Sequence, residues 1–123
     1  MGVRVGIDLV RAATVREAIQ VHGERYLKRV YTDGERDETD DSPEGLAMRF
    51  AAKEAVMKAL APREEPLPWR TIAVRRDPQE GFRVVLSGEA AALAARRGIG
   101  AVRVSLARRR EGAAAVAVAE GVA

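Results

Sequence analysis

The sequence contains no cysteine, which excludes disulfide bonds and thiolate zinc sites and favours a reducing, cytoplasmic setting. Long hydrophobic runs are also missing, since no stretch approaches the roughly 18 consecutive apolar residues that a membrane-spanning helix needs. The first eight residues lack the apolar core of a secretion signal. These absences predict a cytoplasmic protein that does not span a membrane.

Aromatic residues make up only 4% of the 123 residues, whereas alanine is frequent. A chain of this length suits one domain, residues 1–123, because domains cluster at about 100–150 residues. Small side chains give such a domain a thin core, and burial of further surface between identical subunits would compensate for it. The composition therefore favours a homo-oligomer.

Lysine is scarce among the basic residues. Only three of the 21 are lysine, and two of these, Lys53 and Lys58, lie five positions apart in one segment. The formal net charge of +3 favours anionic partners. Acidic residues gather at 33–41 in a run that is nearly free of apolar residues, for which we expect a solvated, mobile loop. A metal site in this run is the alternative, although the run lacks the spacing of a calcium loop.

Hydrophobic periodicity predicts an α+β protein with a mainly antiparallel sheet. The expected order is β-α-α-α-β-β-α-β-β, with a long helix at residues 43–60 packed on the sheet. Apolar alternation indicates strands at 3–8, 71–76, 82–86, 102–106 and 116–118, and helical spacing indicates helices at 15–22, 24–30, 43–60 and 89–97.

The segment RFAAKEAVMKAL at residues 49–60 has no clear solvent-facing side. At about 100° per residue, Arg49 and Lys53 fall within the arc of large apolar side chains, and small residues occupy the opposite side. Charges on such a helix must be paired or ligand-bound, because burying an unpaired charge costs several kcal/mol. Two simpler interpretations remain: Arg49 and Lys53 extend along apolar surface to water, and Glu54 and Lys58 form an i,i+4 surface pair.

Asp8 ends an alternating strand, a position that strands disfavour for this residue type. One interpretation is that its carboxylate caps the helix that follows. The other is a magnesium-diphosphate site, in which a strand carboxylate and a helix carboxylate hold the metal while lysine and arginine bind phosphate oxygens. Spacing alone does not bring Asp8 and Glu54 together.

The segment VGIDLV at residues 5–10, the segment RFAAKEAVMKAL at 49–60 and the closing residues 104–120 carry a family resemblance. Together they resemble holo-acyl-carrier-protein synthase, the family of small bacterial 4′-phosphopantetheinyl transferases. The motif at 49–60 is specific. The short motif at 5–10 would be weak alone but is more informative at this distance in the sequence from the long motif. The resemblance covers essentially the full length and implies a phosphopantetheinyl transferase-like fold.

In this family the serine hydroxyl of a carrier protein attacks the β-phosphate of coenzyme A, and 3′,5′-ADP leaves. The resemblance implies that Asp8 and Glu54 bind Mg²⁺ and that Lys58 stabilises charge on the diphosphate. It makes Glu54 a candidate to accept the serine proton. Coenzyme A contacts are then expected at Arg49, Lys53, Lys58 and Arg108.

The resemblance also implies partners. Family members are typically homotrimers with active sites at subunit interfaces, and their substrate in fatty-acid biosynthesis is an acidic apo acyl carrier protein. A basic region at the first helices is suited to receive that protein. The candidate partner-binding residues are Arg16, Arg25, Lys28 and Arg29.

Four places depart from the family pattern. Residues 61–66 replace a Gly-Thr-Gly-type loop, and Gly81-Phe82-Arg83 replaces Gly-x-Pro. Arg108 stands where histidine is usual, and the first helix begins with residues 11–14, Arg-Ala-Ala-Thr, where an acidic residue and an arginine are more usual. None of these changes touches Asp8, Glu54 or Lys58. The departures therefore concern nucleotide and carrier-protein contacts.

Two other functions remain alternatives. A small basic nucleic-acid-binding domain would use the arginines at 75–76, 96–97 and 108–110, but aromatic stacking residues are scarce. A coenzyme A-binding paralogue would keep the ligand without transferase activity. The resemblance favours the transferase, with coenzyme A and a carrier protein as partners and with neither nucleic acid nor membrane.

Overall fold

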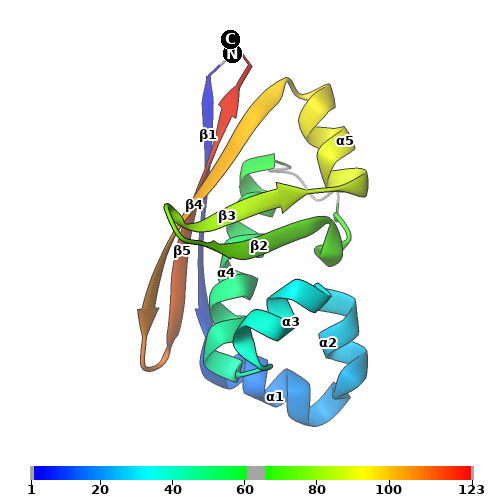
Figure 1. The fold of residues 1–123 in the computed structure, drawn as a ribbon, viewed down its shortest axis with the longest axis vertical. Helices are drawn as coiled ribbons and strands as arrows, with labels where there is room; N and C mark the ends of the chain where they lie inside the picture. Colours follow the sequence, from blue (N-terminus) through cyan, green and yellow to red (C-terminus); the bar gives the residue numbers. More distant parts are fainter. Residues whose placement is uncertain (1, 61–65, 123) are drawn as a thin grey trace.

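The computed structural model describes residues 2–60 and 66–122. Its larger sheet has three antiparallel strands, with β5 (Gly112–Gly121) between β1 (Val3–Arg11) and β4 (Ile99–Arg109) (Figure 1). Val3 pairs with Glu120, so the two ends of the chain lie side by side at one end of this sheet. The first and last strands of the sequence are therefore neighbours.

Helix α4 (Pro43–Leu60) lies against one face of this sheet and is enclosed on most sides, as its sequence predicts. Ten of its eighteen residues are buried, including Arg49 and Lys53. Proline at the first helical position fits the start of the helix, where a missing N–H costs nothing. Neither α4 nor any other helix of residues 2–60 and 66–122 combines the length and the apolar character needed to cross a membrane.

Small residues let the helix and the sheet approach closely. The strand β5 presents buried alanines at alternate positions from Ala113 to Ala119, and α4 has five buried alanines of its own. A Cβ atom on Gly6 of β1 would collide with the carbonyl oxygen of Ala55 and would lie 2.9 Å from the backbone nitrogen of Ala59. Glycine at position 6 therefore sets the distance between β1 and α4.

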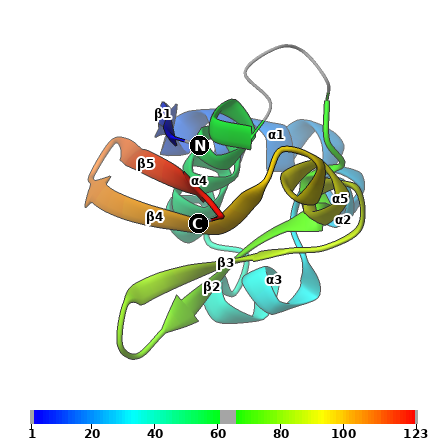
Figure 2. The same ribbon diagram turned by 90° about the horizontal axis from the view of Figure 1, so that it is seen from above.

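A second layer covers α4 on the side away from the large sheet (Figure 2). It consists of the antiparallel hairpin of β2 (Ile72–Asp77) and β3 (Gly81–Leu86), followed by helix α5 (Gly88–Arg96). The main hydrophobic core lies between these two layers and includes Ile72 and Leu93. The long helix is thus the centre of the molecule.

Three short helices gather around the N-terminal half of α4 (Figure 1): α1 (Ala12–His22), α2 (Glu24–Val30) and α3 (Asp33–Thr39). They enclose a second core around Tyr31 and Leu46. The chain turns from α1 to α2 at Gly23, whose φ of 55° suits glycine.

The α+β class, the antiparallel pairing and the predicted elements are confirmed. The prediction of a mobile loop at residues 33–41 is wrong, because residues 33–39 form α3. Thr32 caps this helix in a reciprocal capping box with Glu35, which satisfies the first free N–H groups. Before β2 the structure also adds a short 3₁₀ turn, η1 (Trp69–Thr71).

Candidate active site

Asp8 and Lys58 meet where β1 crosses α4. The Lys58 Nζ donates hydrogen bonds to Asp8 Oδ1 and to the Ile7 carbonyl oxygen, both at 2.9 Å. The Asp8 side chain is mostly buried, whereas Lys58 is 52% exposed. The pair therefore lies at the surface, with its ammonium accessible to a ligand.

Glu54 precedes Lys58 by one helical turn and completes the cluster. Its carboxylate is partly buried and makes no hydrogen bond or ion pair with the residues of 2–60 and 66–122. Burial, followed by the neighbouring charge of Asp8, raises the pKa of Glu54, while Lys58 acts in the opposite direction. The hydrogen bond to Asp8 raises the pKa of Lys58.

This geometry excludes two of the simpler interpretations left open by the sequence. Asp8 does not cap the next helix, because α1 has Arg11 at its N-cap position and no side-chain cap bond. The i,i+4 pair of Glu54 and Lys58 is also wrong for the part of the chain that the structure describes, because Lys58 pairs with Asp8 instead. The predicted strand and helix carboxylates thus share one site.

The donor set fits Mg²⁺ in composition. Two adjacent carboxylates, one of them without a partner among the described residues, favour a hard cation that relieves their repulsion. No group of three or more acidic, histidine or cysteine side chains in residues 2–60 and 66–122 is arranged to hold a metal. A magnesium ion here would therefore have to take its other ligands from water and from substrate phosphate, as this ion usually does.

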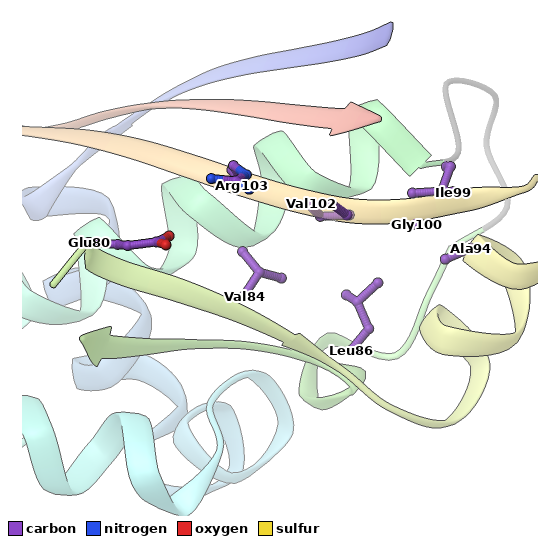
Figure 3. Close-up of a pocket in the computed structure, with 9 residues that line it drawn as sticks. Glu80, Val84, Leu86, Ala94, Ile99, Gly100, Val102 and Arg103 are labelled. Carbon is purple, nitrogen blue, oxygen red and sulfur yellow. The ribbon is translucent and has the colours of Figure 1, made fainter. Parts of the chain in front are cut away.

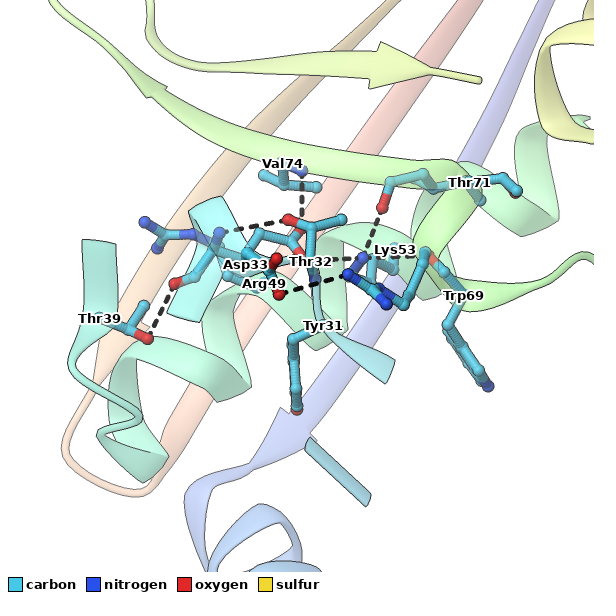
Figure 4. Close-up of polar contacts among 12 residues, drawn as sticks. Tyr31, Thr32, Asp33, Thr39, Arg49, Lys53, Trp69, Thr71 and Val74 are labelled. Atoms are coloured by element: carbon cyan, nitrogen blue, oxygen red, sulfur yellow. Dashed lines mark hydrogen bonds and ion pairs between the residues drawn. The ribbon is translucent and has the colours of Figure 1, made fainter. Parts of the chain in front are cut away.

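Lys53 does not belong to this site (Figure 4). Its side chain is fully buried, and its three protons go to Glu35 Oε1 at 2.9 Å, to the Trp69 carbonyl oxygen at 3.0 Å and to the Ile72 carbonyl oxygen. With every donor used inside the protein, the predicted contact between Lys53 and coenzyme A is not supported by the structure. The alternative of an extension to water is wrong as well, because the ammonium has no access to solvent.

Glu35, a residue that the sequence analysis did not single out, is the partner of Lys53. Its Oε1 also accepts from the Thr32 N–H, and its Oε2 accepts from the Val74 N–H at 2.7 Å. One buried carboxylate thereby joins α3, α4 and β2. The Thr-x-x-Glu spacing of a capping box was the signal in the sequence.

Arg49 is also fully buried, but only some of its hydrogen-bond donors have a partner. Its Nη2 donates to Glu38 Oε1 at 3.1 Å, and the Phe82 ring lies over the guanidinium with its centroid 4.7 Å from Cζ. The Nε and Nη1 groups have no hydrogen-bond partner in the described chain. Burial lowers the pKa of Arg49, against the attraction of Glu38. Buried donors left without acceptors are rare and call for an explanation.

The predicted partner-binding residues fall into two places. Arg16 on α1 pairs with Glu44 at 2.8 Å, which neutralises its charge. Arg25, Lys28 and Arg29 lie on α2, exposed and without an ion pair among the described residues. The structure therefore retains a basic surface on α2 and separates Arg16 from it.

Arg108 is exposed near the end of β4, opposite Ala113 of β5. Asp8 lies opposite Ala115 of the same strand, so Arg108 and Asp8 share a sheet face but stand two strands and two residues apart, or about 12 Å. One chain does not bring them together. The loop that replaces the glycine loop of the family lies, at residues 61–65, outside the described residues.

A separate cavity of about 350 Å³ opens between β3 and β4 (Figure 3). Val84 and Leu86 of β3 face Val102 of β4 across it, and Glu80 and Arg103 stand toward one end. None of the predicted site residues lines this cavity. The Asp8, Glu54 and Lys58 cluster therefore remains the candidate for chemistry.

Comparison of the sequence with known proteins finds similarity over nearly the full chain. The family model of the 4′-phosphopantetheinyl transferase superfamily matches residues 4–119. A holo-[acyl-carrier-protein] synthase of Desulforudis audaxviator is 41% identical over 120 residues, which cover 95% of this chain and 92% of the relative. One of Rhodopirellula baltica is 38% identical over 107 residues, with 85% and 86% coverage.

Solved structures show the same similarity. The acyl carrier protein synthase of Mycobacterium tuberculosis aligns with a TM-score of 0.78 and 34% identity over 97% of both chains. The holo-[acyl-carrier-protein] synthase of Helicobacter pylori, solved in complex with coenzyme A, aligns with a TM-score of 0.82 and 26% identity, covering 94% of this chain and 99% of that one.

Proposed function

The chain belongs to the 4′-phosphopantetheinyl transferase superfamily, and we propose that its Asp8, Glu54 and Lys58 cluster carries a magnesium-dependent transfer that releases 3′,5′-ADP. The protein is an enzyme of the holo-[acyl-carrier-protein] synthase type, which transfers the 4′-phosphopantetheine arm of coenzyme A to acyl carrier protein. The observation that carries the proposal is the Lys58–Asp8 contact beside the partly buried Glu54.

In the proposed reaction, the Oγ of the carrier-protein serine forms a bond to the β-phosphorus of coenzyme A. The bond from that phosphorus to the bridging oxygen breaks, and its electron pair leaves with 3′,5′-ADP. Glu54 is the candidate to take the serine proton, because its carboxylate lies beside Asp8 and Lys58 and makes no hydrogen bond or ion pair among the described residues.

Lys58 has two of its three protons held by Asp8 and Ile7, which leaves one to donate to a diphosphate oxygen. Asp8 orients that ammonium before substrate arrives, so little reorganisation accompanies the reaction. Asp8 and Glu54 would hold Mg²⁺, which when bound neutralises charge on the diphosphate and its leaving oxygen.

Arg49 remains a candidate contact for coenzyme A. Its two unpartnered donors suit a phosphate oxygen, and they stand on the same helix as Glu54. The whole side chain is buried, so a phosphate reaches these donors only after the residues that cover them move. Arg108 is the other candidate, and its exposure leaves it free to meet a phosphate.

Assembly into a homotrimer is supported by the outer face of the large sheet. Alternate side chains of β1 point away from α4 and are largely exposed, namely Val3, Val5, Ile7 and Leu9. Val116 extends this face on β5, opposite Ile7. An apolar sheet face of this kind marks an interaction surface, and a second and third copy of the chain would bury it.

The acceptor in this proposal is an acidic carrier protein of fatty-acid biosynthesis, attracted by the basic surface of α2. Among the nucleic-acid alternative's arginines, Arg75 donates to Glu38 and Arg97 donates to the Leu60 carbonyl oxygen. Both guanidinium groups thus serve the fold, and no observation favours that alternative. A cytoplasmic location stays a prediction from the cysteine-free composition.

The experiment is a transfer assay with purified protein, coenzyme A and apo carrier protein, read by the mass of the carrier. We expect the pantetheine arm to appear on the carrier only when Mg²⁺ is present, and activity to return when the ion is restored after chelation. Coenzyme A binding without any transfer would instead identify the inactive paralogue. Equal transfer in chelator would contradict the role of the ion.

A further inference from the structure

The position of the Glu54 carboxylate depends on how α4 is turned about its axis. The carboxylate has no hydrogen bond or ion pair within residues 2–60 and 66–122, so no contact of its own holds it beside Asp8. A helix with its side chains has a radius of about 5–6 Å, so a rotation of about 10° moves the end of a side chain by about 1 Å. A misplacement of about 1 Å can lower a reaction rate about 100-fold. The site therefore needs the rotation of α4 to be fixed.

The side of α4 that meets the large sheet consists of small residues. The backbone of Ala55 and Ala59 lies against Gly6 of β1, and β5 presents its row of buried alanines to the same helix. A helix is held at one angle by ridges of side chains that fit into the grooves of its neighbour. Alanine gives low ridges, so this contact secures a close approach but resists rotation only weakly.

Lys53 holds α4 from the side of the second layer. It comes directly before Glu54, so the two side chains point about 100° apart around the helix. Its ammonium donates to Glu35 Oε1 at 2.9 Å, to the Trp69 carbonyl oxygen at 3.0 Å and to the Ile72 carbonyl oxygen. These acceptors belong to α3, η1 and β2. Three separate segments thus converge on one nitrogen, one residue before Glu54.

Net stability is a poor explanation for this buried ion pair. The side chains of Lys53 and Glu35 are both fully buried, so each charge has lost its hydration. Apolar side chains of similar volume in place of such a pair often leave a protein equally stable or more stable. Hydrogen bonds have preferred distances and angles, which apolar contacts lack. The pair therefore supplies direction to α4 at the turn that carries Glu54.

We propose that Lys53 and Glu35 are positioning residues for the transfer and act through Glu54. Their buried pair fixes the rotation of α4 and thereby the place of the Glu54 carboxylate beside Asp8. Neither residue touches a substrate. The inference rests on the proposed function, in which Glu54 takes part in the reaction.

The experiment removes both charges at once with the double variant Glu35→Gln/Lys53→Met, which keeps the side-chain lengths. We expect kcat per folded enzyme to fall about tenfold or more, with the KM values for coenzyme A and carrier protein changed less than twofold. Calorimetric titration of Mg²⁺ into the enzyme with coenzyme A, without carrier, should show weaker binding by several-fold. A folded double variant with wild-type kcat and wild-type Mg²⁺ binding would overturn the proposal.

The matched control removes another ion pair of α3. Arg36 donates to Glu24 at 2.7 Å and to Asp41 at 2.8 Å, and none of its side-chain hydrogen bonds among the described residues reaches α4. Urea unfolding verifies that each variant is folded under assay conditions. We expect Arg36→Met to keep kcat within twofold of the wild type, whatever its unfolding midpoint. Equal kcat values for the folded control and the folded double variant would contradict a positioning role.

A second variant covers the case in which the double variant does not fold. Glu35→Asp keeps both buried charges and moves the carboxylate away from the Lys53 ammonium by one methylene group. We expect it to fold and to lower kcat about threefold or more, and wild-type kcat in this variant would overturn the proposal.

Failure of the proposed function gives a different result. If the wild-type protein transfers nothing under any condition, the proposed function fails and this inference fails with it. If the wild type transfers and Glu54→Gln is slow while the variants at Glu35 and Lys53 keep the wild-type kcat, only the positioning role is wrong.

Discussion

Lysine is a better fit than arginine for the contact that Lys58 makes. Its compact ammonium donates to Asp8 and to the Ile7 carbonyl oxygen at once and keeps one proton for a ligand. A planar guanidinium has a different reach and a fixed fork of donors. The use of lysine instead of arginine thus has a local reason at Lys58. It has one at Lys53 too, where three acceptors converge on one buried nitrogen.

We expect Lys58→Arg to lower kcat by roughly tenfold or more, because the charge remains but cannot satisfy both contacts and the phosphate. Stability should change little, since the side chain is half exposed. Steady-state transfer kinetics measure the effect, with Arg96→Lys as a charge-conserving control on α5. A Lys58→Arg enzyme with wild-type kcat would show that charge alone is required.

Glu54 is expected to weaken folding when it ionises. Its pKa is raised above the ordinary 4.5 in the folded protein, so the folded state holds the proton more tightly than the unfolded chain. Stability should therefore fall as pH rises from 4.5 through the raised pKa, and it should stay lower at pH 7.

Glutamine cannot ionise, so Glu54→Gln should be more stable than the wild type at pH 7, and this gain should disappear below about pH 4. Denaturant unfolding at the two pH values measures it, with the exposed Glu89→Gln as control. A Glu54→Gln variant that is less stable than the wild type at pH 7 would mean that the carboxylate is held by favourable contacts.

At the scale of elements, the contact of β1 with α4 determines the site. We expect Gly6→Ala to destabilise the fold by about 1–3 kcal/mol, because the added methyl group meets the Ala55 carbonyl oxygen and must push the strand away. Transfer should fall too, since Asp8 moves with the strand. Gly2→Ala is the matched control, because a Cβ there meets nothing within 4 Å. Equal unfolding free energies for the two variants would show that the crossing tolerates a wider spacing.

The strands, the long helix and the strand–helix carboxylate pair were predictable because each carries a local signal, such as alternation, a proline start or a family motif. The helix α3 was missed because its acidic sequence resembles a solvated loop, and its stability comes from tertiary contacts. Glu35 pairs with Lys53, and Glu38 pairs with Arg49. The partners are far apart in the sequence but in contact in the structure. A buried ion pair needs both partners, and one sequence shows only that partners must exist.

On the scale of the whole molecule, the exposed apolar face of β1 is the surface that we assign to subunit contact. If the protein forms the proposed trimer, we expect Val5→Lys to convert it to a monomer, because lysine on an apolar contact leaves a charge unpaired in the interface. Sedimentation velocity measures the change. Val21→Lys on α1 is the control, since Val21 is 67% exposed and lies away from this face, whereas Val5 is 54% exposed on it. A Val5→Lys protein that sediments like the wild type would exclude this face as the interface.

The two faces of the large sheet differ in what they contact. The face of the large sheet that carries Asp8 meets α4, whereas the opposite face is free for other copies. The side chains of the candidate site and those of the proposed subunit interface thus alternate along β1.

The most direct test of the central claim is the mass of apo acyl carrier protein after incubation with coenzyme A, Mg²⁺ and enzyme. Wild-type protein, Glu54→Gln and the control Glu89→Gln are compared at matched concentrations, with folding of each verified by denaturation. We predict that Glu89→Gln adds the pantetheine arm at the wild-type rate and that Glu54→Gln is slower by about 100-fold or more. A folded Glu54→Gln variant that modifies the carrier at the wild-type rate would contradict the assignment of this site.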